Sequence, residues 1–152
     1  RSNILTKTRG NGIFASRFLK YFPVGRIAAR VRNGVLIASE AGESTAYALS
    51  NMQQRGASFI GPGMKVYEGM IIGLANQTQD LEINVCKTKQ LTNFRSNADI
   101  AIVLASPKIL SLEQCLDFLE EDELLEVTPK NLRLRKKLLN KTARVKAMRK
   151  KE

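Results

Sequence analysis

The chain has 152 residues, of which 43% are hydrophobic and 26% are charged, as is ordinary for a folded globular domain. It has no histidine, and its two cysteines, Cys86 and Cys115, lack the spacing of a zinc site. This composition excludes a Ser-His-Asp centre and a histidine-ligated metal, and it favours a reducing, cytoplasmic setting, with an organellar stroma or matrix as the other option. No stretch approaches the roughly 20 apolar residues of a membrane helix.

The net charge of +11 is unevenly placed along the chain. Residues 1–34 hold eight basic and no acidic side chains, and residues 130–152 hold eleven basic and one acidic. Residues 35–129 hold six basic and thirteen acidic side chains, so two basic ends flank an acidic middle. Clustered cations attract a polyanion, which predicts a nucleic-acid partner.

The amino-terminal segment leaves two alternatives open. Phe14, Phe18 and Phe22 recur every four residues, as on a helix, whereas the flanking glycines and Pro23 leave only the length of a strand. The chain starts with Arg1, neither an initiator Met nor a signal peptide, so we expect a piece of a longer protein.

The middle of the chain reads as mixed helix and strand. The apolar run 35–38 predicts a central strand, and residues 44–55 predict a helix followed by a left-handed Gly56. A turn at 61–63 leads into a predicted strand over 65–74, which Gly69 and Gly73 interrupt with a bulge or bend. Further strands are predicted over 81–85 and 100–104, with a polar loop over 87–97 between them.

The last third gives the clearest signals. Ser111 and Gln114 have the spacing of a capping box, and a helix with apolar positions at i, i+3, i+4 and i+7 follows. We interpret the acidic run 120–123 as a solvated helix end. Residues 124–127 and 132–135 predict a strand–turn–strand unit, and the tail 138–152 is either a basic helix or disordered. Together these elements predict an α+β fold with a mainly antiparallel, barrel-like sheet, two amphipathic helices and a basic tail.

Several ordered motifs then match a known family. They are NGVLI (33–37), AYAL (46–49), QRG (54–56), PGMKVYEGMIIG (62–73), LTN (91–93) with Arg95, DELLEVTP (122–129) and LRLRK (132–136). In these motifs the chain closely resembles the carboxy-terminal region of the BipA/TypA family of translational GTPases, over nearly its whole length. It departs from the family at residues 74–79, which are neutral where the family usually has charged residues. The stretch after Arg95 is also one residue shorter than in the family.

The resemblance implies a division into domains and a set of partners. Residues 1–24 would end an elongation-factor-G-like domain, which makes the segment 14–22 a strand, and residues 25–137 would form the family-specific C-terminal domain. That domain enters the ribosomal A site in the family and contacts large-subunit RNA and the acceptor end of a tRNA, in ribosome assembly and stress adaptation. The family's GTPase domain, which binds GTP and magnesium, lies upstream, so we expect no cofactor, no catalytic residue and no metal site in this chain.

The resemblance and the charge pattern together give candidate RNA-binding residues. The loop 87–97 mixes cations with side chains that can bond a base edge or a 2′-hydroxyl. The residues 133–137 carry cations expected on one exposed face, and Arg30 and Arg32 either line the domain junction or meet RNA. The full set is Lys87, Lys89, Thr92, Asn93, Arg95, Arg133, Arg135, Lys136, Lys137, Arg30 and Arg32.

A second class of function is a protein-interaction module whose acidic middle docks a basic ribosomal protein. An independent enzyme is disfavoured, because the sequence has no GxxxxGK[ST] phosphate loop and no imidazole base. We therefore expect a monomeric ribosome-binding module without a membrane partner.

Overall fold

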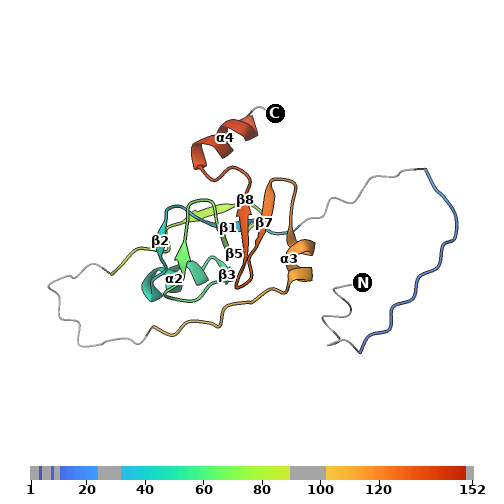
Figure 1. Cartoon of the computed structure of the whole chain (residues 1–152), viewed down its shortest axis with the longest axis horizontal. Coiled ribbons are helices and arrows are strands. Elements are labelled where there is room, and N and C mark those ends of the chain that lie inside the picture. The colour runs from blue at the N-terminus through green and yellow to red at the C-terminus, as the bar shows by residue number, and fades with distance from the viewer. Residues whose placement is uncertain (1–3, 5–7, 9–10, 24–31, 90–101, 150–152) are drawn as a thin grey trace. The chain divides into compact units, whose positions relative to one another are not determined.

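A computed structural model of the chain describes residues 4, 8, 11–23, 32–89 and 102–149 (Figure 1). The chain divides into two compact units, Arg1–Val31 and Arg32–Glu152. The elements of the second unit are β1 (Val35–Ala38), β2 (Gly42–Glu43), α2 (Ala46–Gln53), β3 (Gly56–Ser58), β4 (Lys65–Val66), β5 (Ile71–Ala75), β6 (Leu81–Ile83), α3 (Leu112–Phe118), β7 (Glu123–Val127), β8 (Leu132–Lys136) and α4 (Lys141–Arg149).

In the first unit, the strand expected over 14–22 does not form. Residues 11–23 have neither helical nor strand structure, and their apolar side chains are exposed. Phe18 and Tyr21 contact each other edge to face, with ring centroids 5.0 Å apart. A strand gains its backbone hydrogen bonds from a neighbouring strand, and no strand in the described part of the chain pairs with this segment.

The second unit is built on a four-stranded sheet with the order β3-β5-β1-β6. The pairs β3–β5 and β5–β1 are antiparallel, whereas β1 and β6 are parallel. Two further pairs, β2–β4 and β7–β8, form separate antiparallel sheets. The α+β prediction is confirmed, but the sheets among the described residues do not close into a barrel as expected, because β3 and β6 remain open edges.

The central strand β1 is buried on both faces, and its alternating side chains separate two apolar clusters. Leu36 and Ala38 belong to the cluster that contains Leu49 and Met52 of α2. Val35 and Ile37 belong to the other cluster, which contains members of α3 and the β7–β8 hairpin, namely Cys115, Leu134, Phe118 and Leu125. One sheet face is thus covered by α2 and the other by α3 and the hairpin.

Helix α2 forms where it was predicted, but Gly56 has a different role from the expected left-handed one. Thr45 caps the helix by accepting a hydrogen bond from the Ala48 backbone N–H, and Gln54 ends it in a right-handed conformation. Gly56 instead begins β3, where an added Cβ would lie 2.1 Å from the Leu74 carbonyl oxygen. The glycine therefore allows two strands to approach closely.

The strand predicted over 65–74 is divided as its glycines indicated. It forms β4 and β5, and Gly69 lies between them with a φ of 82°. A register shift opposite Leu36 and Ile37 places the bulge between Ile71 and Gly73 of β5. The glycines predicted a bulge or a bend, and the structure has a bend at Gly69 and a bulge in β5.

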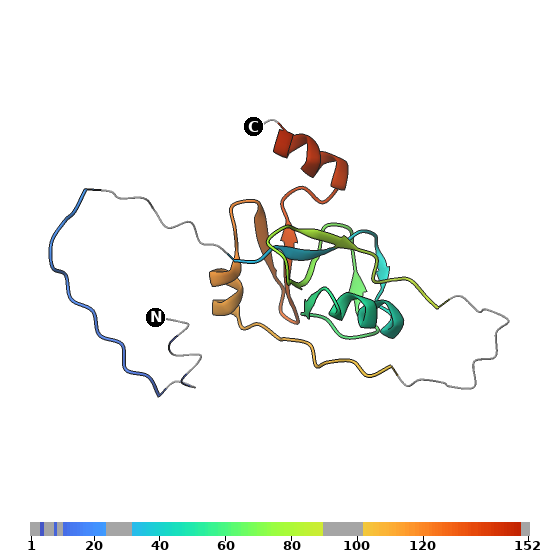
Figure 2. The ribbon, with the colours of Figure 1, turned by 180° about the vertical axis from the view of Figure 1, so that it is seen from behind.

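The strand predicted over 100–104 is wrong for its described residues. Residues 102–104 are not in a strand, and 86% of Val103 is exposed. Figure 2 shows the segment after residue 101 running without helix or strand toward α3. An apolar run needs a partner strand to become a strand itself, and this segment has none among the described residues.

The C-terminal elements match the prediction more closely. The capping box of α3 is complete, with Ser111 and Gln114 exchanging side-chain and backbone hydrogen bonds. The β7–β8 hairpin pairs Glu123 with Lys136 at one end and Val127 with Leu132 at the other. Of the two alternatives for the tail, the structure has the helix, α4, which follows β8 in Figure 1.

Candidate nucleic-acid interface

The candidate residues belong to three parts of the chain: the loop after β6, the end of the β7–β8 hairpin and the segment before β1. The cations of the tail helix are described with them. Arg30, Thr92, Asn93 and Arg95 lie outside the described residues. The remaining candidates divide into exposed cations and cations that the chain's own carboxylates bind. This division decides which of the cations are accessible to a partner outside the chain.

Lys87 and Lys89 are exposed, at the start of the loop predicted over 87–97. The Thr45 hydroxyl, which caps α2, also donates a hydrogen bond to the Lys87 backbone carbonyl. Cys86 is fixed in turn, because its N–H donates to Asn84 Oδ1 at 2.9 Å. The first residue of the loop is therefore anchored to α2, while the lysine side chains have no carboxylate partner within the described part of the chain.

On β8, Arg133 and Arg135 are half-buried rather than fully exposed. Arg135 Nε lies 2.7 Å from Glu126 Oε1, and Glu126 lies opposite Arg133 in the hairpin register. The Tyr67 hydroxyl donates to the other oxygen of Glu126 at 2.8 Å. Burial and this bond to a carboxylate raise the pKa of Tyr67. Glu126 thus neutralises part of the positive charge expected on this strand.

The structure corrects the expectation for Lys136. Its side chain is 2% exposed, and its ammonium lies 2.7 Å from Asp80, 2.8 Å from Asp122 and 3.0 Å from Glu123. Burial alone would lower the pKa of Lys136, but the hydrogen bonds from its ammonium to these carboxylates raise it to about 12. Alternation along β8 places Lys136 on the same side as buried Leu134, so only Lys137 of this pair is exposed.

Arg32 also binds carboxylates of the second unit. Its Nε lies 2.9 Å from Glu120 Oε1, and its Nη2 binds Glu123. The guanidinium carbon lies 4.2 Å from the centre of the Phe118 ring, a cation–π distance. Arg32 therefore joins the start of the unit to α3 and β7.

The acidic run 120–123 is consequently more than the solvated helix end that we expected. Glu123 has no exposed side-chain surface and binds both Arg32 and Lys136. Carboxylate oxygens of Glu120, Asp122 and Glu123 lie within 4.8 Å of one another. The two cations offset the charge of this cluster, so it is an internal ion-pair network.

In the tail helix, Arg144 is an anchor. It is 9% exposed, its Nη1 donates to the carbonyls of Leu138 and Leu139, and its Nη2 lies 2.7 Å from Glu82 Oε1. Lys141 lies 3.0 Å from the second oxygen of Glu82. Burial would raise the pKa of Glu82, but the hydrogen bonds from Arg144 and Lys141 outweigh it and hold the pKa below its usual value.

Beyond this anchor, α4 presents exposed cations. Lys146 and Arg149 lie in its last turn and have no carboxylate partner among the described residues. Cations at the carboxyl end of a helix are also favoured by the helix dipole. The tail is therefore held through Arg144 and Lys141, and it leaves Lys146 and Arg149 accessible.

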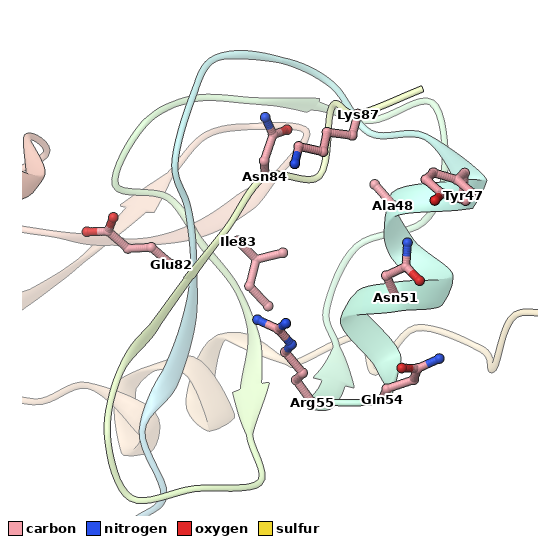
Figure 3. Close-up of a pocket in the computed structure, with 9 residues that line it drawn as sticks. All are labelled: Tyr47, Ala48, Asn51, Gln54, Arg55, Glu82, Ile83, Asn84 and Lys87. Carbon is pink, nitrogen blue, oxygen red and sulfur yellow. The ribbon is translucent and has the colours of Figure 1, made fainter. Parts of the chain in front are cut away.

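Sequence reasoning missed a pocket of about 420 Å³ between α2 and the region around β6 (Figure 3). Tyr47, Asn51, Gln54 and Arg55 line it from the helix side, and Lys87 lines it from the other. Tyr47 and Asn51 are four residues apart on one face of α2, and Gln54 and Arg55 follow directly after the end of the helix. These polar residues were the only sign of the pocket in the sequence. The residues that line its other side lie some thirty positions further along the chain.

With this geometry in view, the comparisons with known proteins define the family. A model of the TypA/BipA C-terminal domain matches residues 33–141. The chain is 48% identical over 137 residues to the large ribosomal subunit assembly factor BipA of Synechocystis sp., covering 90% of this chain and 23% of that protein. It is 46% identical over 154 residues to the factor of the same name from Bacillus subtilis, covering 99% of this chain and 25% of that protein.

A chloroplastic TypA-like protein of Arabidopsis thaliana is 45% identical over 135 residues, which cover 88% of this chain and 20% of that protein. The chain belongs to the BipA/TypA family and corresponds to its C-terminal domain. It spans about a quarter of the length of the relatives it matches, and these residues do not include a GTPase catalytic domain. Among the described residues, none of the helices has the length and apolar character needed to cross a membrane.

Proposed function

We propose that this chain is the ribosome- and RNA-binding C-terminal module of a BipA/TypA-like translational GTPase. It would contact large-subunit RNA and the acceptor end of an A-site tRNA, and act in ribosome assembly and stress adaptation. The names of two relatives, large ribosomal subunit assembly factors, support the ribosomal partner. The proposal includes the domain division at residue 24, a monomeric state and a cytoplasmic or organellar location.

The observation that carries the proposal is the separation of bound from exposed cations. The cations in the interior, Arg32, Lys136 and Arg144, bind carboxylates of this chain. Lys87 and Lys89 on the loop, and Lys146 and Arg149 on the tail helix, have no carboxylate partner in the part of the chain described. Exposed cations on two separate elements suit the phosphates of a folded RNA.

The loop 87–97 is proposed to supply recognition, and the tail to supply attraction. The loop mixes Lys87, Lys89 and Arg95 with Thr92 and Asn93, so it offers both donors and acceptors. The tail offers chiefly cations, which respond to charge rather than to geometry.

The test compares Arg95→Ala with the unchanged chain on intact ribosomes and on a random RNA duplex. Hydrogen bonds from charged groups contribute about 1.5–3 kcal/mol, so ribosome affinity should fall by about ten- to a hundredfold. Duplex affinity should fall much less, and Asn93→Ala should weaken ribosome binding to a smaller extent while shifting the RNA footprint. Equal losses of affinity for the ribosome and for the duplex would show that the loop acts only through its charge. A melting temperature lowered by several degrees would make Arg95 a structural residue.

The alternative, docking of a basic ribosomal protein by the acidic middle, is disfavoured by ion pairing within the domain. Asp80, Glu82, Asp122, Glu123 and Glu126 each bind a lysine or arginine of this chain. Their charge is therefore not free to attract a basic partner. Binding that survives ribonuclease treatment of the ribosome would favour the protein partner instead.

We also propose that the chain binds no cofactor and turns over no GTP, since its sequence has no phosphate loop. Incubation of the chain with GTP and ribosomes should release phosphate at the rate of ribosomes alone. A faster release that survives repeated purification would overturn this part of the proposal.

A further inference from the structure

The pocket between α2 and β6 combines three kinds of side chain that meet separate parts of a nucleotide. Arg55 and Lys87 supply positive charge, Asn51 and Gln54 supply side-chain amides, and Tyr47 supplies an aromatic ring. Its volume, about 420 Å³, falls in the range of small-ligand sites. All its lining residues are described and belong to the second unit.

The charge of this pocket favours a phosphate. Neither Arg55 nor Lys87 has a carboxylate partner among the described residues. Glu82 is the single carboxylate in the lining, and both of its oxygens bind cations of the tail helix, at 2.7 and 3.0 Å. Figure 3 shows the Glu82 carboxylate directed away from α2 and the residues on it. An anion in the pocket would thus meet two unneutralised cations.

The arrangement of the two cations indicates more than one phosphate. In the view of Figure 3, Lys87 lies at one end of the pocket and Arg55 at the other, with Asn51 of α2 between them. A nucleotide within an RNA strand has a phosphate on each side of its sugar, whereas a free monophosphate has only one. Two cations at opposite ends therefore fit a nucleotide in a strand.

The helix face between the cations suits an unpaired base. An amide side chain offers a donor and an acceptor, so Asn51 and Gln54 can bond a base edge. Tyr47 is partly exposed at the start of α2 and presents a ring for stacking. Ala48 and Ile83 add apolar surface to the lining. The exposed edges of a base are accessible in single strands, loops and bulges rather than in an RNA duplex.

We propose that this pocket binds one unpaired nucleotide of an RNA strand, with its flanking phosphates at Lys87 and Arg55 and its base beside Tyr47 and Asn51. The inference rests on the proposed function and adds a site that lies outside the loop 87–97 except for Lys87. Because Lys87 is also the first residue of that loop, an RNA strand that contacts the loop can continue directly into the pocket.

The experiment uses the 152-residue chain and measures the affinity of a short fluorescent single-stranded RNA. Arg55→Ala and Asn51→Ala should each weaken binding by about tenfold, a loss typical of one charged contact or one recognised base. Lys65→Ala removes an exposed cation on β4 and is the matched control, with a much smaller expected loss. Both pocket residues are exposed, so thermal melts of the variants should match that of the parent chain.

Three small ligands distinguish an RNA strand from other phosphate sources. A nucleoside 3′,5′-bisphosphate should compete with the RNA more strongly than a nucleoside 5′-monophosphate, and inorganic phosphate should compete least. Equal competition by the two nucleotides would overturn the strand model. Ribosome binding that is intact in the parent chain and unchanged in Arg55→Ala and Asn51→Ala would overturn the pocket while leaving the proposed function in place. Failure of the parent chain to bind any RNA or ribosome would overturn both.

Discussion

The Lys136 ammonium lies 3.0 Å from Glu123 Oε1, and both side chains are almost completely buried. Glu123 also binds Arg32, so one carboxylate joins the start of the domain to its last strand. Burying charges is costly unless each is paired, and removal of one partner leaves the others uncompensated. The sequence motif LRLRK therefore contains a structural lysine beside its arginines.

Lys136→Met should destabilise the domain, because Asp80, Asp122 and Glu123 would then repel one another around an apolar side chain. We expect the free energy of unfolding to fall by about 3 kcal/mol, the lower end for a broken buried pair, since Asp80 and Asp122 keep some solvent exposure. Urea denaturation measures this change. The adjacent Lys137→Met removes an exposed cation and should cost less than about 0.5 kcal/mol. A stable Lys136→Met protein with weakened RNA binding would restore Lys136 to the interface.

The contact between Glu82 and the tail helix should depend on pH in the acid range. The pKa of Glu82 is lowered from its usual 4.5, so the stability that this carboxylate contributes is complete above pH 4.5. It is lost as the pH falls through the lowered value of the folded state. The difference in unfolding free energy between the parent and Glu82→Gln should therefore be constant near neutral pH and shrink below about 4.5. A difference that persists unchanged in acid would show that the charge of Glu82 does not hold α4.

The tail should contribute to RNA binding through its exposed cations rather than through all of them. The affinity should fall less steeply with salt in Lys146→Ala and in Arg149→Ala. Each substitution should reduce the magnitude of the slope of log affinity against log salt by roughly 0.7–0.9. Lys141→Ala should change the slope less, because this ammonium already lies 3.0 Å from Glu82. Binding isotherms at several salt concentrations measure the slope. An unchanged slope in a Lys146→Ala, Arg149→Ala double variant would mean that the tail does not contact RNA.

Gly69 should tolerate no side chain. Its φ is 82°, and an added Cβ would lie 2.7 Å from Leu139 Cα, in the segment that leads to α4. Gly69→Ala should therefore cost about 1–2 kcal/mol for the left-handed backbone, and more for displacing Leu139. Gly61 is the matched control, because an added Cβ there meets no atom within 4 Å. Equal melting temperatures for Gly61→Ala and Gly69→Ala would contradict this assignment.

The elements that could be predicted from sequence are those fixed by neighbours in the chain. The capping box of α3, the bulge in β5 and the β7–β8 hairpin depend on residues a few positions apart, and all three formed. The segment 102–104 was mistaken for a strand because its apolar composition does not reveal whether a partner strand is present. Gly56 was misread because the close approach of β5 lies outside its local sequence.

The candidate site shows the same limit. Exposure of Lys87 and Lys89 followed from their polar surroundings, whereas the burial of Lys136 depends on Asp80, which is 56 positions away in the sequence. The pocket of Arg55 and Lys87 likewise joins a helix to a segment after β6. Charge counting identified where cations are abundant, but only the fold separates the cations that bind carboxylates of the protein from those that remain exposed.

The contacts of Arg32 have a mechanical consequence. Tension applied through the residues before Arg32 would reach α3 and β7 first, because Phe118, Glu120 and Glu123 hold its guanidinium. The apolar cluster around Leu36 and Met52 lies on the other face of the sheet. It would bear this load only after the contacts of Arg32 with α3 and β7 had broken. We therefore expect stretching from the amino-terminal side to give a short first extension that Arg32→Ala abolishes.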